Sequence, residues 1–267
     1  VTVLKKETFA SCAALASVTL PPALEQIGSQ CFVSCGRLQK LVLPEGVTQL
    51  GWGAFSWCKT LKEISLPSTL EQIGSGCFAG CSKLRAFHVA PDSPYLCAEG
   101  AMLFNRDKTV LLSAPAAKGK FSVPKGVREI WEGACNFCEG ITQLTVPGSV
   151  KKIDAWAFQG CGRMTKAVLE DGVEEIGLRA FSKCPELEEI TLPRSVIQIH
   201  PKVFDEHPKL IYALSLPISA FSVESKPAAV LGFVQMYERQ EKLPEKIVSQ
   251  NLKYIRSQRR KLYSLAE

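Results

Sequence analysis

The stretch "LQKLVLPEGVTQLGWGAFSWC", residues 38–58, contains the pattern that decides the fold. Residues 38–44 alternate aliphatic and other side chains as a short strand does, and Pro44 ends the strand because proline cannot donate to a sheet ladder. Residues 47–51 supply a second extended piece. Ala54, Phe55 and Cys58 then follow at helical spacing, which predicts a single helical turn.

The same pattern recurs every 23 residues, and an internal repeat of this length is typical of a solenoid. One such unit cannot bury its apolar side alone, so about eight copies are expected to stack around a shared core. Cys135 replaces the repeated phenylalanine in one copy, and His207 replaces the repeated cysteine in another. The remaining copies are marked by Phe9, Phe32, Phe55, Phe78, Phe158, Phe181 and Phe204, and by Cys12, Cys35, Cys58, Cys81, Cys138, Cys161 and Cys184.

A glycine often follows the second extended piece and suggests a tight turn there, at Gly28, Gly51, Gly74 and Gly177. Trp131 occupies the same place in another copy. A strict requirement for positive φ is therefore not expected at this position.

The 11 cysteines raise the question of thiol or metal chemistry. A residue repeated in every rung needs no chemical role, and free cysteine is a small side chain that is often buried. We therefore expect the repeated cysteines, with Cys31 and Cys77, to fill the core. Cys135 and Cys138 form a C-x-x-C pair, which leaves a thiol redox or metal-binding protein as an alternative of another class. No metal ligands and no cofactor are predicted.

The repeat resembles the 23-residue leucine-rich repeat of BspA-like bacterial proteins over residues 1 to about 213. The resemblance implies an α/β solenoid, a right-handed curved array with a parallel sheet on one side and short turns on the other. The family's roles are binding roles, including adhesion and coaggregation. No catalytic residues accompany the motif, so we expect a protein that is not an enzyme.

Residues of about 90–120 interrupt the period. Two apolar runs, residues 102–104 and 110–112, flank a polar turn at residues 105–108 and predict a β-hairpin. This hairpin island resembles a feature of BspA-like arrays. The island would either determine which partner binds or simply lengthen one repeat.

Outward positions on the predicted strands offer a broad, shallow surface that suits a protein or glycan partner better than a small molecule. Solvation of a sheet face is the alternative. The four tryptophans, Trp52, Trp57, Trp131 and Trp156, would either pack between rungs or contact a partner. The candidate binding residues are Thr19, Lys40, Val42, Glu63, Ser65, His88, Gln143, Thr145, Lys166, Glu189 and Thr191.

Residues 214–267 break the pattern and predict a small α-helical C-terminal region. It would cap the solenoid, begin a further helical domain, or offer a basic stripe to an acidic partner, RNA or anionic lipid. The net charge of +6 lies mostly there, since ten of the 32 Lys and Arg and five of the 26 Asp and Glu lie from Pro208 onward. The nearly neutral repeats give no electrostatic case for nucleic acid.

No apolar run approaches the ~20 residues that span a bilayer, so no transmembrane segment is predicted. Val1 already lies inside the pattern, and we expect the sequence to begin part-way through a longer protein. Free cysteines and a helical tail similar to those of some Firmicutes proteins without secretion signals favour the cytoplasm over secretion or the cell surface. The leading interpretation is a protein-binding scaffold, with a cell-surface adhesin for host or matrix protein as the alternative.

Overall fold

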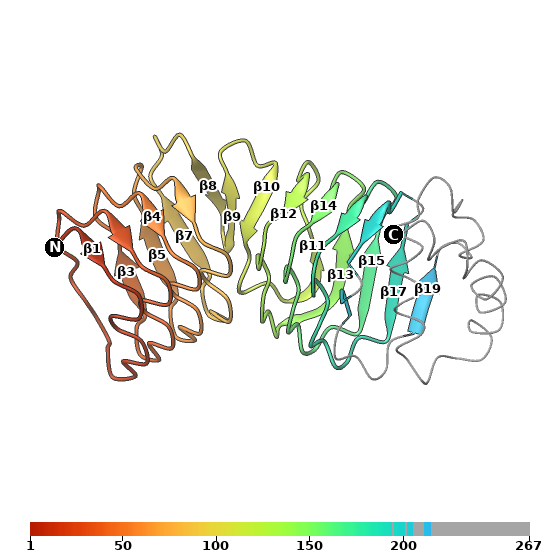
Figure 1. Ribbon diagram of the computed structural model, residues 1–267, viewed down its shortest axis with the longest axis horizontal. Helices are drawn as coiled ribbons and strands as arrows, with labels where there is room; N and C mark the ends of the chain where they lie inside the picture. Colours follow the sequence, from red (N-terminus) through yellow and green to blue (C-terminus); the bar gives the residue numbers. More distant parts are fainter. Residues whose placement is uncertain (194, 201, 205–210, 215–267) are drawn as a thin grey trace, which may run out of the picture.

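The computed structural model describes residues 1–193, 195–200, 202–204 and 211–214. Its coils stack along one gently arched axis (Figure 1). The stacking confirms the predicted solenoid. Each regular coil contributes one strand to a longer-strand row, one strand to a shorter-strand row, and one connecting segment to a third side. We call that third side the turn side, represented by residues 51–58 in one coil.

The longer-strand row consists of two parallel sheets, because β7 and β11 are not hydrogen-bonded to each other. The first sheet contains β3 (Lys40–Val42), β5 (Glu63–Leu66) and β7 (Ala86–Val89). The second sheet contains β11 (Gly119–Ser122), β13 (Ile141–Val146), β15 (Lys166–Leu169), β17 (Glu189–Leu192) and β19 (Ile211–Leu214).

The shorter-strand row is also divided into two sheets, between β6 and the inserted strands. Its parallel strands recur once per copy, as β1 (Val3–Leu4), β2 (Gln26–Ile27), β4 (Gln49–Leu50), β6 (Gln72–Ile73), β12 (Glu129–Ile130), β14 (Lys152–Ile153), β16 (Glu175–Ile176) and β18 (Gln198–Ile199). These eight strands correspond to the eight predicted copies.

The core is a column of phenylalanine rings, as the period predicts. Phe32, Phe55 and Phe78 are each at most 1% exposed, and consecutive rings stack with centroids 5.3 and 5.6 Å apart. Phe158 and Phe181 form a second stack at 5.5 Å. Each ring therefore fills space that belongs to its own coil and to both neighbouring coils.

The helical turn predicted for the turn side is wrong, and the described residues contain no helix. The amides of Gly53, Phe55 and Trp57 donate to carbonyls of the next coil at 2.7–3.0 Å, while the amides between them donate to carbonyls three residues back. Gly53 and Trp57 have φ values of 58° and 61°. This alternation satisfies the backbone between coils, whereas an α-helix would direct every amide to its own segment.

The glycines that follow the shorter strands are required by close approach and not by φ, since none of the four has a positive φ. A Cβ at Gly28 would lie 2.7 Å from the Lys6 nitrogen, and a Cβ at Gly74 would collide with the backbone of Gly51 and Trp52. Trp131, Asp154 and His200 occupy the same place in three other copies, so the close approach that requires glycine is not made in every coil.

The insertion contains the predicted hairpin, in which β9 (Met102–Asn105) and β10 (Val110–Ser113) pair antiparallel. The sequence did not predict a third antiparallel strand, β8 (Leu96–Glu99), which pairs with β9. Because β10 also pairs in parallel with β12, the hairpin takes the place of one rung in the shorter-strand row.

The turn side continues across the insertion although both strand rows are interrupted. The amides of Gly76 and Gly80 donate to the carbonyls of Glu132 and Asn136 at 3.4 and 3.2 Å. Both pairs of partners are 56 residues apart in sequence, whereas the equivalent partners of a regular coil, such as Gly53 and Ser75, are 22 apart. Trp57 contacts Phe137 across the same junction, with ring centroids 4.6 Å apart.

The predicted helical region at residues 214–267 lies outside the described residues, apart from Leu214, which ends β19. His207 also lies outside them. Among the described residues, no helix has the length and hydropathy needed to cross a bilayer.

We predict that Phe55→Ala lowers the free energy of unfolding by about 3–5 kcal/mol, because it opens a cavity shared by three coils. Thermal or urea unfolding measures the loss. The control is Lys40→Ala, which removes an exposed side chain; equal shifts for the two variants would contradict the assigned core.

We also predict that Gly51→Ala destabilises the protein by about 1–3 kcal/mol, because the new methyl group would overlap the backbone of Ser29. Gly36→Ala is the matched control, since a Cβ there would be 4.0 Å from the Ala13 oxygen. Equal unfolding midpoints in urea for the two variants would show that the coils do not approach as closely as described.

Candidate functional site

Ten of the eleven candidate binding residues lie on the longer-strand row, where the structure separates them into two groups. We call Lys40, Val42, Glu63, Ser65 and His88 the first patch, and Gln143, Thr145, Lys166, Glu189 and Thr191 the second patch. Thr19 is exposed but belongs to no strand. Its segment lies on the end coil and forms no ladder with β3, so the predicted strand there is wrong.

Glu63 is the electrostatic centre of the first patch. Its carboxylate lies 3.7 Å from Lys40 Nζ, 3.5 Å from His88 Nε2 and 3.7 Å from an Arg85 guanidinium nitrogen. Parallel pairing of β3, β5 and β7 produces this cluster, because it aligns Lys40 with Glu63 and Ser65 with His88. Arg85 was not predicted, since it precedes its strand and lies outside the alternating series.

Val42 gives the first patch an apolar centre. Its side chain is 58% exposed, and its neighbour in register on β5 is Ser65. An exposed aliphatic side chain ringed by polar groups is the usual composition of a protein-binding surface. The partly exposed ion pairs around it add little stability, so their main effect is to hold the side chains in place.

The second patch has the same composition on the other sheet. Lys166 Nζ lies 2.9 Å from a Glu189 carboxylate oxygen. Val168 lies in register between Thr145 and Thr191 and is partly exposed. Because β7 and β11 do not pair, the insertion separates this patch from the first.

The repeated cysteines are confirmed as core residues, with the exception of Cys12. Six of them, Cys35, Cys58, Cys81, Cys138, Cys161 and Cys184, are at most 1% exposed, and each thiol donates to a carbonyl oxygen of the preceding coil at 3.0–3.4 Å. Cys12 is exposed because no described coil precedes its own. Cysteine is therefore a small apolar side chain that also satisfies a buried carbonyl.

Burial also suppresses thiol reactivity. It raises the pKa of Cys31 to about 11, and it raises the pKa of Cys77 and Cys161 as well. The pKa of Cys135 is raised well above its ordinary value, mainly by a hydrogen bond with the Cys138 thiol and secondly by burial. A redox-active C-x-x-C motif instead has a lowered pKa and some exposure, so the environment of Cys135 and Cys138 favours the structural interpretation.

All 11 cysteines are unpaired. Within the described ranges, no group of three or more His, Cys, Asp or Glu side chains is placed to hold a metal ion. Cys97, which lies on β8 in the insertion, is partly exposed and is thereby distinguished from the core thiols.

A family model described as "BspA type Leucine rich repeat region (6 copies)" matches residues 1–97 and 118–226. The chain belongs to this family. The unmatched residues 98–117 contain β9 and β10, so the insertion departs from the BspA-type repeat in sequence as well as in structure. No curated protein matches the chain.

Solved structures of bacterial leucine-rich repeat proteins share the fold. A leucine-rich repeat protein from Eubacterium ventriosum superposes with a TM-score of 0.64 at 20% identity, covering 81% of this chain and 70% of that one. The pneumococcal vaccine antigen PcpA superposes with a TM-score of 0.54 at 18% identity, covering 76% of this chain and 59% of that one.

We predict that thiol titration of the native protein at pH 8 modifies Cys12 rapidly and Cys97 more slowly. The nine buried cysteines should react only after denaturation, because burial excludes the reagent. Mass spectrometry of the labelled peptides identifies the sites. Rapid native labelling of Cys135 or Cys138 would restore the redox alternative.

Proposed function

We propose that this BspA-type leucine-rich repeat protein is a non-enzymatic scaffold that binds a protein partner over its longer-strand row. The observation that carries the proposal is the pair of similar patches, each with a valine surrounded by polar and charged side chains. Membership of a leucine-rich repeat family supports a protein-binding or adhesin-like role.

The shape of the row supports a macromolecular partner. Parallel strands present their outward side chains in a broad array, which suits the extended contact of a macromolecule better than the enclosed contact of a small molecule. The charges within each patch are mixed, with Glu63 facing cations on both sides and Lys166 paired with Glu189. Such a surface matches a partner with complementary charges around an apolar contact.

The same face would serve for a cellular protein or, in an adhesin, for a host or matrix protein. The similarity to PcpA shows the fold alone, so the choice depends on identifying the partner. Capture on the immobilised full chain, followed by purification of each candidate, provides partners for affinity measurements.

We predict that Val42→Arg or Val168→Arg weakens binding of the purified partner by about tenfold or more, because a large charge enters the apolar centre of a patch. Surface plasmon resonance measures Kd for each variant. Val3→Arg is the matched control, because Val3 is 44% exposed on β1 of the other row. Wild-type affinity in both patch variants would overturn the assignment of the binding face.

A further inference from the structure

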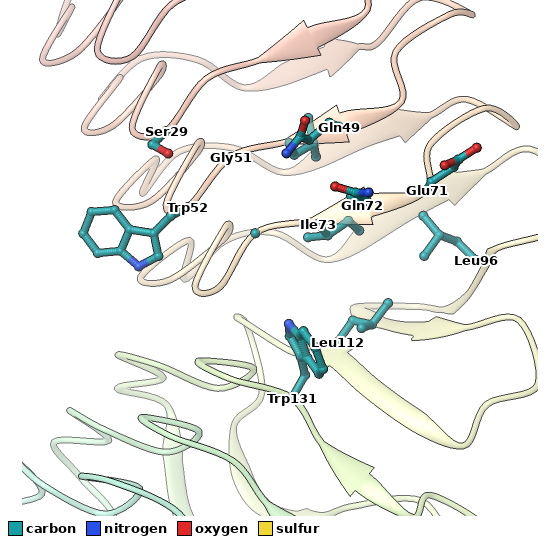
Figure 2. Close-up of a pocket in the computed structure, with 12 residues that line it drawn as sticks. Ser29, Gln49, Gly51, Trp52, Glu71, Gln72, Ile73, Leu96, Leu112 and Trp131 are labelled. Atoms are coloured by element: carbon teal, nitrogen blue, oxygen red, sulfur yellow. The ribbon is translucent and has the colours of Figure 1, made fainter.

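The break in the shorter-strand row leaves a groove between β6 and the insertion (Figure 2). β6 pairs only with β4, and β8 pairs only with β9, so no ladder closes the space between them. The groove has a volume of about 510 Å³, within the usual range of ligand sites. It lies on a different row from the two patches.

Trp131 lines the groove on the side of the insertion (Figure 2). Gly28, Gly51, Gly74 and Gly177 hold the equivalent place in four coils and touch the backbone of the preceding coil, whereas Asp154 and His200 hold it in two others. The Trp131 amide donates to the Leu111 carbonyl of the hairpin at 3.0 Å, just as the amides of those glycines donate to the preceding coil. Its ring stands beside Leu112 in the groove (Figure 2). Ile73 and Gly74 line the opposite wall. The separation of the coils therefore makes room for an indole.

A second indole and a row of amides complete the lining. Trp52 is 51% exposed at one end of the groove. Gln49 and Gln72 lie in register on β4 and β6, and both are exposed. Their side-chain amides form no hydrogen bond within the part of the chain that the structure describes, so their donors and acceptors are free for a ligand. Glu71 accepts a hydrogen bond from the Tyr95 hydroxyl at 2.8 Å.

We propose that this groove binds a neutral oligosaccharide. A hexose ring has an apolar C–H face, which packs against an indole ring, and a rim of hydroxyl groups. Each glutamine amide both donates and accepts, as hydroxyl groups do. Trp52 and Trp131 would contact the ring faces, while Gln49 and Gln72 would bind the hydroxyls.

The lining disfavours two other ligand classes. No cation lines the groove, and its one charged residue is Glu71, so a sialylated or sulfated glycan would meet repulsion. An extended peptide would have to add to the free edge of β6, which is only two residues long. Strand addition depends on main-chain hydrogen bonds along an exposed edge, and this edge offers few.

The test is a glycan array carrying neutral and anionic oligosaccharides, probed with the full chain, followed by isothermal titration with the neutral glycans that bind. Trp52→Ala and Gln72→Ala are each expected to weaken binding by about tenfold, as the loss of one well-formed contact would. Trp156→Ala is the matched control, because Trp156 is a partly buried tryptophan that does not line the groove. Tryptophan fluorescence should change on saturation in the wild type and less in Trp52→Ala.

Three results would overturn the proposal: no neutral glycan binds, only anionic glycans bind, or neutral glycans bind Trp52→Ala and Gln72→Ala as tightly as the wild type. Thermal unfolding of each variant verifies that it is folded. Because the patch variants lie on the other row, their effect on protein binding is measured independently.

Discussion

The structure depends on the backbone hydrogen bonds that join each coil to the next along the turn side. Amides of one coil reach carbonyls of its neighbour at every second residue, and the amides between them close turns within the coil. The residues with positive φ allow this alternation. A constant repeat length follows, because each coil must return to the same place for these bonds to form, and a buried backbone group without a partner is costly.

This close stacking explains which side chains occupy the interior. Rings about 5–6 Å apart fill the space between coils. The cysteine three residues after each ring donates its thiol to the backbone carbonyl of the phenylalanine in the preceding coil, as Cys58 does to Phe32. Where Cys135 replaces a ring, Ala114 lies at the equivalent place in the shortened coil and accepts from Cys138. The two substitutions together interrupt the ring column at the insertion.

The insertion shows what happens when this stacking is only partly kept. The turn side keeps two hydrogen bonds across the junction, from Gly76 and Gly80, while both strand rows open. The longer-strand row is thereby divided into two patches of similar chemistry, and the shorter-strand row acquires a groove lined by tryptophan and glutamine. A single extra segment therefore creates both surface features on which the proposals rest.

The period, the eight shorter strands, the phenylalanine and cysteine core and the hairpin can all be predicted from the sequence, because each depends on the side-chain pattern within one repeat. The sequence also placed ten candidate residues on the longer strands. It did not show that Arg85 joins Glu63, since that contact depends on the register between strands. The ladder on the turn side, in place of a helix, and the position of Trp131 in a groove became visible only in the folded chain, because both follow from contacts with a neighbouring coil that no local pattern encodes.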